Sequence, residues 1–340
     1  MKIIDLFSGI GGFSLGFQKA GYQFTEHYFS EIDKHAIANY KYNFPHAKHI
    51  GDITTLHGGD FTDIDIITFG SPCQDFSLAG RREGLKGAKS SLIQHAIALI
   101  ADIRPSIFIW ENVKGAFSSN AGADFWAIIQ AFANIGGYRL EFQLLNTKWV
   151  LPQNRERIYL IGHLAGRSQP GVFPITEDDC APRKEKTYQF QAKLSGTLKA
   201  NGNMNADDTY IIPKTASTLT GGGHSGGLHS DMTIIRQLPR GKNKGADLKI
   251  CPTISSNAFQ ENNLLEGVRR LTEIECERLQ GFPDNWTQYG DYNGTIKSIA
   301  RTQRYKLIGN AVTVDIVELI AKRLKFIVDE FTPYTQKEMV

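Results

Sequence analysis

The chain has few cysteines: only Cys73, Cys180, Cys251 and Cys276 occur among its 340 residues. They are 107, 71 and 25 residues apart. None of them therefore forms a CxxC pair, the spacing typical of zinc sites and redox motifs. Zinc and disulfide frameworks are poorly supported, and any cysteine with a special role must act alone.

The first residues lack a long apolar run. They read MKIIDLFSGIGG, in which one lysine is followed by Asp5 and a glycine cluster. Signal peptides and membrane spans do not have this pattern, so we expect a cytoplasmic protein that does not cross a membrane. The contents of 41% hydrophobic and 21% charged residues are those of a globular chain, which excludes disordered, collagen-like and coiled-coil classes.

Neither sign of charge is in large excess over the whole chain, since the formal net charge is only +3. Residues 1–175 hold 16 lysines and arginines against 15 aspartates and glutamates. Residues 181–250 hold 11 against 5, together with nine glycines. This local excess indicates either a surface for a polyanion or a solvated loop region with ordinary lysines, and charge alone does not separate the two.

Apolar β-branched runs alternate with helix-like stretches through the first 165 residues. The runs 2–7, 64–69 and 107–110 are followed by helical patterns at 13–20, 91–103 and 123–135. This alternation predicts an α/β fold with a doubly wound, mostly parallel sheet. Two further strand patterns, 139–145 and 157–164, are separated by a short polar link and predict a hairpin that closes the sheet.

A second, smaller, loop-rich domain is expected where this rhythm stops and Gly, Asn, Ser and Thr dominate. We place it at residues 176–296, and the first domain at 1–175 plus 297–340. Thr272 and Glu275 form a capping-box pattern, and Gly281 with Pro283 forms a stop signal, so a short helix lies between them. An apolar stripe at helical spacing predicts a helix over 311–331 that packs back on the first domain.

The segment from Asp5 to Gly12 follows the first predicted strand and opens a helix. Glycines there let the backbone approach a ligand, and a helix N-terminus favours polar or anionic groups. The spacing is not the dinucleotide motif GxGxxG. Glu31 stands where an acid would accept from ribose hydroxyls, and Asp52 could meet an adenine amino group. These positions favour an adenosine-containing cofactor over a purely structural turn.

Four candidate catalytic residues stand at the ends of strands of the same predicted sheet. Cys73, in GSPCQ, comes after the run 64–69, and Glu111 stands at the end of the run 107–110, directly after Trp110. Open α/β sheets place their sites at the carboxyl ends of strands, so a thiol and a carboxyl would share one rim. Arg155 and Arg157 precede a further strand and would point to one side. A lone cysteine is more often a buried apolar residue, and the arginines could form a surface ladder with Glu156, but the joint placement favours a site.

The ordered set FSGIGG, SEID, GDI, GSPCQ, ENV, QNRERIYLIG, RLTEIECERLQGFPD and GNAV resembles the C5-cytosine DNA methyltransferase family across nearly the whole chain. The resemblance implies the Rossmann-like fold of S-adenosylmethionine-dependent methyltransferases, with a target-recognition domain inserted near residues 168–265. It implies S-adenosyl-L-methionine as methyl donor, S-adenosyl-L-homocysteine as product, and no metal.

Roles for individual residues follow from this resemblance. Cys73 would attack C6 of a cytosine flipped out of double-stranded DNA, Glu111 would bind N3 and the exocyclic amine, and Arg157 would meet O2. Arg155 would support the thiolate, the carboxylate or a phosphate. The cofactor would lie against Phe7, Gly9, Gly11, Glu31, Asp52, Pro72, Leu92, Asn310 and Val312. Ile32 stands where many members have tryptophan, so adenine stacking would be weaker or come from Phe7 alone.

Other readings stay open at this point. A tRNA cytosine-5 methyltransferase shares the apparatus, but its Cys-Phe-Thr signature is missing, since Cys180 and Cys251 precede Ala and Pro. A decayed DNA-binding protein would more often have lost one of the four catalytic residues. A nicotinamide oxidoreductase does not account for GSPCQ or for the basic region. We expect a monomer, and the resemblance allows a cognate restriction endonuclease encoded nearby.

Overall fold

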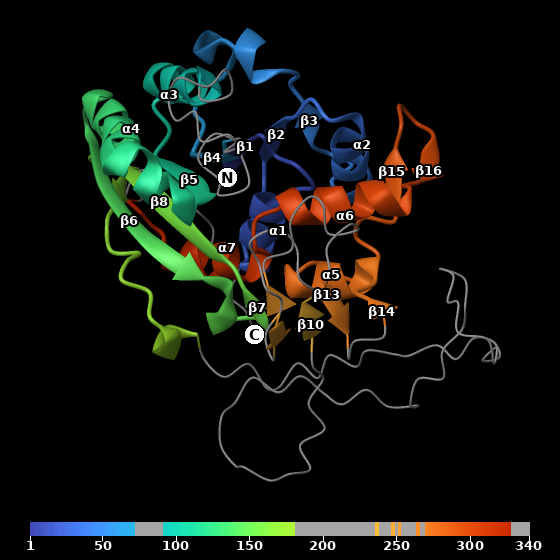
Figure 1. Ribbon diagram of the computed structural model, residues 1–340. Helices are drawn as coiled ribbons and strands as arrows, with labels where there is room; N and C mark the ends of the chain where they lie inside the picture. The colour runs from blue at the N-terminus through green and yellow to red at the C-terminus, as the bar shows by residue number, and fades with distance from the viewer. Residues whose placement is uncertain are drawn as a thin grey trace, which may run out of the picture.

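A seven-stranded sheet forms the centre of the computed structural model, in the order β3-β2-β1-β4-β5-β8-β6 (Figure 1). The structure describes residues 1–71, 91–180, 235–237, 246–248, 251–252, 263–265 and 269–327. The strands of this sheet are β1 (Lys2–Leu6), β2 (Glu26–Ser30), β3 (Lys48–His49), β4 (Ile66–Gly70), β5 (Ile107–Val113), β6 (Tyr138–Asn146) and β8 (Glu156–Leu164).

Strands β3, β2, β1, β4 and β5 pair in parallel. Their central members are apolar and buried along almost their whole length, as expected where helices cover both faces of a sheet. β8 then runs antiparallel to β5, and β6 antiparallel to β8. The predicted doubly wound α/β sheet and its closing hairpin are therefore confirmed.

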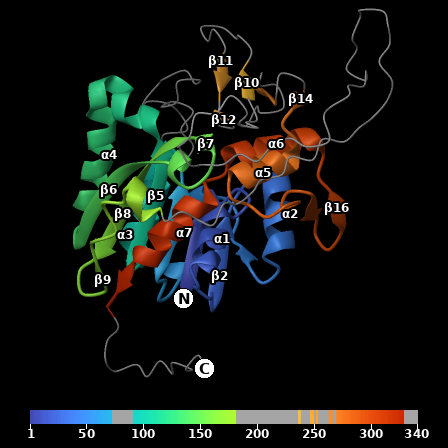
Figure 2. The ribbon, with the colours of Figure 1, turned by 90° about the horizontal axis from the view of Figure 1, so that it is seen from below.

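Helices cover the two faces of the sheet (Figures 1 and 2). Ile4 and Leu6 of β1 belong to an apolar cluster with α3 and α4, whereas Ile3 belongs to a cluster with α1 and α7. This is the alternation of side chains expected along a strand. The helices are α1 (Gly12–Lys19), α2 (Lys34–Asn43), α3 (Ser91–Ile103), α4 (Ala123–Asn134), α5 (Glu273–Leu279), α6 (Arg301–Asn310) and α7 (Val314–Arg323).

The C-terminal helix is shorter than the sequence predicts. The predicted helix 311–331 is wrong at both ends, because α7 begins at Val314 and ends at Arg323. Leu324 is extended, and β17 (Lys325–Phe326) pairs with β9 (Ser168–Gln169) instead of continuing the helix. The short helix near residue 272 is confirmed as α5, with Thr272 and Glu275 forming the predicted capping box. Residues 328–331 lie outside the described part of the chain.

Within residues 181–270, the described segments are short strands (Figures 1 and 2). They form a sheet in the order β11-β10-β13-β14, while β12 pairs in parallel with β7 of the first domain. Their bounds are β7 (Gln153–Asn154), β10 (Ile235–Gln237), β11 (Ala246–Leu248), β12 (Cys251–Pro252), β13 (Asn263–Leu265) and β14 (Arg269–Arg270).

The segment after β14 packs against the N-terminal part of the chain. Phe282 and Ile299 share an apolar cluster with Ile10 and Leu15 of the N-terminal segment. The hairpin of β15 (Tyr289–Asp291) and β16 (Ile296–Ser298) lies against α2, where the Asn39 amide donates to the carbonyl of Tyr289 at 2.8 Å. Residues 282–299 thus contact the N-terminal part of the chain, and the division at 176–296 stays a prediction.

We predict that Gly162→Ala destabilises the fold. A Cβ atom at Gly162 of β8 would lie 2.1 Å from Cε1 of the buried Phe108 on β5. Because a close-packed interior yields little, we expect a loss of about 1–3 kcal/mol in the free energy of unfolding, measured in urea.

Gly59→Ala is the matched control, since nothing lies within 4 Å of a Cβ at that position. It should change stability by no more than about 0.5 kcal/mol. Equal stability of the two variants would contradict the packing described for β5 and β8.

Candidate active site

The loop between β1 and α1 has an unusual backbone. Phe7, Gly9 and Gly11 all have positive φ, at 50°, 54° and 83°. Such a conformation is uncommon for a residue other than glycine, and it is found where function constrains the chain. At Gly11 a side chain is excluded, because a Cβ would lie 2.4 Å from a ring carbon of Phe44. Gly11 is also the N-cap of α1, and no side chain caps that end.

Glu31 joins this loop to the end of β2. Its Oε2 accepts from the amide of Gly9 at 3.0 Å, and its Oε1 accepts from the amides of Ile32 and Asp33 at 2.8 and 2.9 Å. A carboxylate offers about four lone-pair positions, so these three bonds leave room for a further donor such as a hydroxyl. The structure thus brings Gly9 and Glu31 together, while Ile32 beside them is 74% exposed.

Asp52 stands at the start of the short 3₁₀ helix Ile53–Thr55, and Leu92 stands at the start of α3, which contacts that helix. Asp52 follows β3, is exposed, and uses Oδ1 to cap a short 3₁₀ helix through the amide of Thr54 at 3.0 Å. Leu92 is half-buried in the first turn of α3 and packs against the core cluster on that face of the sheet. Pro72 and Cys73 lie outside the described residues, which stop at Ser71, directly after β4.

The segment from Asn310 to Val312 approaches the same loop from the far end of the chain. Asn310 ends α6 and is exposed. Val312 is 8% exposed, and its Cγ2 lies 2.6 Å from where a Cβ on Gly12 would be. The glycine therefore permits this close contact between the start of α1 and the link from α6 to α7.

Glu111 and Arg157 form an ion pair at the end of β5. Arg157 Nε lies 3.0 Å from Glu111 Oε1, and both side chains are largely buried. Glu111 is paired in register with Gly70, the last residue of β4, and a Cβ there would lie 3.2 Å from Glu111 Oε2. Two of the predicted catalytic residues thus meet beside the segment that leads to Cys73. Glu156, the alternative partner, pairs with Lys114 at 2.9 Å instead.

Arg155 is 3% exposed and points into the protein interior. Burial lowers its pKa to about 9, with Arg157 adding to the effect and Glu111 opposing it. Its Nη1 and Nη2 donate to the carbonyls of Gly309 and Ala311 at 3.3 and 2.8 Å. The two arginines are therefore differently engaged, although the sequence groups them together.

A buried polar network under the loop was not identified from the sequence. Asp5, fully buried in β1, accepts from Thr68 at 3.0 Å and from Tyr40 at 3.2 Å. The Tyr40 hydroxyl shares a 2.8 Å hydrogen bond with His27 Nε2. Burial raises the pKa of Asp5 to about 8 and lowers that of His27 to about 4. In the sequence, only Asp5 itself, at the start of the segment Asp5–Gly12, could have pointed to this network, because its partners come together only in the fold.

Trp286 was also missed. Its Nε1 donates to the carbonyl of Ile10 at 3.0 Å, and its ring packs on Phe44 and Phe282. The side chain thus supports the loop from a position 276 residues away in the chain. No periodicity or spacing links two segments at such a distance.

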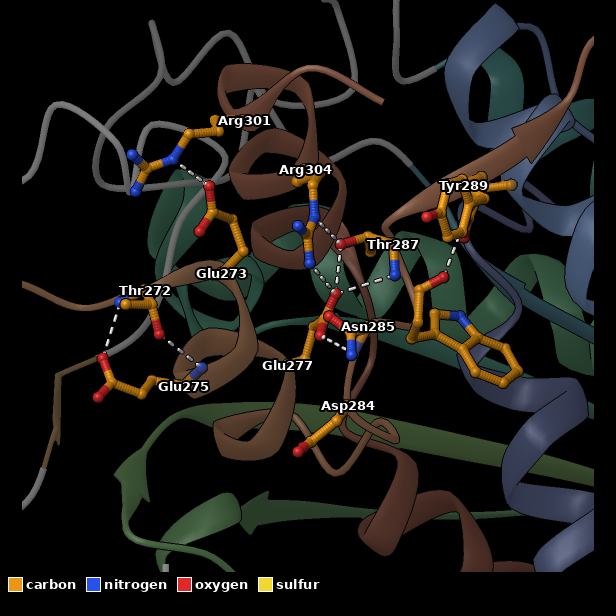
Figure 3. Close-up of polar contacts among 12 residues, drawn as sticks. Thr272, Glu273, Glu275, Glu277, Asp284, Asn285, Thr287, Tyr289, Arg301 and Arg304 are labelled. Atoms are coloured by element: carbon orange, nitrogen blue, oxygen red, sulfur yellow. Dashed lines mark hydrogen bonds and ion pairs between the residues drawn. The ribbon is translucent and has the colours of Figure 1, made fainter. Parts of the chain in front are cut away.

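Ion pairs join α5 to α6 (Figure 3). The fully buried carboxylate of Glu277 accepts from Arg304 at 3.0 Å and from the amide of Asn285 at 2.7 Å. Glu273 of α5 pairs with Arg301 of α6 in the same way. Within the described ranges, no group of three or more His, Cys, Asp and Glu residues could hold a metal ion. None of the described helices is long and apolar enough to cross a membrane.

Residues 1–326 match the sequence model of the family described as C-5 cytosine-specific DNA methylase. The Type II methyltransferase M.Bsp6I of Bacillus sp. (strain RFL6) is 30% identical over 338 residues, which cover 95% of this chain and 98% of that protein. The Type II methyltransferase M1.ScrFI of Lactococcus lactis subsp. cremoris is 32% identical over 341 residues, with 95% and 77% covered.

Two solved structures share the fold. One is described as a DNA modification methyltransferase encoded within a prophage of E. coli, with a TM-score of 0.60, 23% identity, and coverage of 95% of this chain and 97% of that one. The other is the S. pombe Dnmt2 methyltransferase, with a TM-score of 0.57, 21% identity and the same coverage.

The network around Asp5 predicts a pH dependence of stability. The folded pKa of about 8 lies above the value of about 3.9 in an unfolded chain, so the folded protein keeps a proton that the unfolded chain has lost. The free energy of unfolding therefore falls as the pH rises from about 4 to 8. His27 acts in the opposite direction, but only between about 4 and 6.5, so the window from pH 6.5 to 8 isolates Asp5.

Across that window we expect a loss of about 1–2 kcal/mol in the wild-type chain and a much smaller loss in Asp5→Asn, measured by urea unfolding. The exposed Asp60→Asn is the control and should keep the wild-type slope. An unchanged slope in Asp5→Asn would show that another group titrates there.

Proposed function

Since the chain belongs to the C-5 cytosine-specific DNA methylase family, we propose that it transfers a methyl group from S-adenosyl-L-methionine to C5 of a cytosine in a short sequence of double-stranded DNA. The observation that supports this reaction best is the Glu111–Arg157 pair. It stands at the sheet rim where β4 leads into GSPCQ, and the glycine loop after β1 opens at the same rim.

The residues around the glycine loop fit the methyl donor. The loop leaves the N-terminus of α1 without a side-chain cap, and Glu31 holds a carboxylate beside it. Glu31 would accept from the ribose, and exposed Asp52 from the adenine amine, while Ile32 and Phe7 would lie against the ring. Asn310, Val312, Gly9, Gly11, Pro72 and Leu92 would complete the pocket. When bound, S-adenosylmethionine supplies an electrophilic methyl group.

On the cytosine side, the Cys73 thiolate would attack C6 and make C5 nucleophilic. Glu111 would hydrogen-bond N3 and the exocyclic amine as charge develops on the ring, and Arg157, which holds Glu111 in place, would meet O2. After the methyl group has moved to C5, removal of the C5 proton and elimination of Cys73 would free the product. The base must leave the duplex to reach this rim, which costs a few kcal/mol of unstacking.

The region near 168–265 would read the DNA sequence, with its excess of lysines and arginines on the phosphates. M.Bsp6I and M1.ScrFI are Type II methyltransferases by name, which supports DNA as the substrate and a cognate endonuclease as a companion gene product. We also propose a monomer that acts in the cytoplasm. The Dnmt2 likeness concerns the fold, and the missing Cys-Phe-Thr signature argues against a tRNA substrate.

Cys73→Ala should abolish methyl transfer, because no other group would form the bond to C6. The test is incorporation of labelled methyl into unmethylated genomic DNA, with DNA binding retained. Cys180→Ala, at a half-buried cysteine in the link out of the first domain, is the control and should keep full activity. Turnover by Cys73→Ala within tenfold of wild type would contradict the mechanism.

Glu111→Gln should lower kcat by about 10²–10⁴, the usual contribution of a positioned acid or base, since the amide keeps the shape of the side chain but not its charge. Glu156→Gln is the matched control, because that carboxylate, at the start of β8, pairs with Lys114 instead of Arg157. Single-turnover rates on one DNA substrate measure both. Similar rates for the two variants would remove Glu111 from the reaction.

A further inference from the structure

Arg155 lies in the link between β7 and β8, and its own backbone is fixed on both sides. Its amide donates to Oδ1 of Asn146 at 3.2 Å, and its carbonyl accepts from the amide of Thr147 at 2.9 Å. The side chain then runs inward, to the two carbonyls of Gly309 and Ala311.

Those carbonyls stand at the C-terminal end of α6, on either side of Asn310. The last carbonyls of a helix have no partners within the helix, and a cation at that end is favoured by the helix dipole. Two donors from one planar guanidinium therefore determine the course of the chain through Asn310 more firmly than a single bond would.

The segment after Asn310 contacts the end of the loop between β1 and α1. Val312 touches the start of α1 at Gly12, and the Thr313 hydroxyl bonds Thr147 at 2.8 Å and Gln280 at 3.1 Å. The hydrogen bonds of Thr313 thus join this segment to Thr147, whose amide also bonds the Arg155 carbonyl, and to Gln280 at the end of α5.

A contact between Arg155 and DNA phosphate is poorly compatible with this placement. The residue is 3% exposed, whereas phosphates contact side chains that reach the surface. Arg157, two residues further on, is the one paired with Glu111. The two arginines therefore have different partners, the backbone of residues 309–311 for Arg155 and Glu111 for Arg157.

We propose that Arg155 is a positioning residue of the methyl-donor pocket, which holds Asn310 and Val312 against the loop between β1 and α1. The identity of the ligand rests on the proposed function. Arg155 acts through the backbone of residues 309–311, and Arg157 acts at the cytosine.

The test compares Arg155→Lys with Arg157→Lys, using S-adenosylhomocysteine as the probe and isothermal titration without DNA. Lysine keeps the charge but cannot reproduce the paired donors of the guanidinium. In Arg155→Lys we expect the Kd to rise by about tenfold, the usual effect of losing one hydrogen bond from a charged donor. The KM for S-adenosylmethionine should rise to match, while kcat at saturation stays within about threefold.

Arg157→Lys should show the reverse: a Kd within about twofold of wild type and a clear loss of kcat. Hydrogen exchange gives a second readout, since amides near residues 309–314 should exchange faster in Arg155→Lys than in wild type, with no change in α3 or α4. An Arg155→Gln variant adds to the series if it folds, but the lysine variant decides.

Wild-type affinity for S-adenosylhomocysteine in Arg155→Lys, together with a fall in kcat, would overturn the positioning role and place Arg155 at the cytosine. A wild-type protein that binds no S-adenosylhomocysteine would instead overturn the proposed function. The two failures are therefore distinguishable in one titration series.

Discussion

The parallel pairing of β1 with β2 and β4 is the constraint on which the site depends. Backbone hydrogen bonds place Asp5 opposite Phe29 on one side and Thr68 on the other, so all three strands end at the same level. The glycine loop, Glu31 and the segment that leads to Cys73 therefore start next to one another. The polar network around Asp5 lies directly below this edge and joins β1, β4 and α2 by side-chain bonds.

The second half of the site depends on a strand that runs the other way. β8 lies antiparallel to β5, so Arg157 enters the sheet at the level where β5 ends, opposite Val113. If β8 ran parallel to β5, its C-terminal end, and not Arg157, would lie at the edge where β5 ends. The reversal allows one short link, between β7 and β8, to supply Arg157 to Glu111 and Arg155 to the backbone of residues 309–311. Under the proposed function, the groups for cytosine chemistry and for donor binding are thus joined over a few residues.

Local pattern was enough for strands β1, β4, β5, β6 and β8 and for helices α1, α3, α4 and α5, and it placed Glu111 and Arg157 at strand ends, because strand ends and side-chain alternation follow from short-range rules. It was not enough for Arg155, since nothing in QNRER indicates that one arginine turns toward α6 and the next toward β5. Trp286 and the partners of Asp5 were invisible for a similar reason: each contact joins segments that only the tertiary fold brings together. The length of α7 was missed because Leu324 fits the apolar stripe, yet pairing with β9 ends the helix there.

The most direct test of this account is transfer of labelled methyl from S-adenosylmethionine to unmethylated genomic DNA and to bulk tRNA in parallel, followed by bisulfite sequencing of the labelled polymer. The account predicts label in DNA alone, with 5-methylcytosine confined to a short recurring sequence. Label in tRNA alone would contradict DNA as the substrate, and label in neither, from a protein that binds the donor, would contradict the catalytic role of the sheet rim.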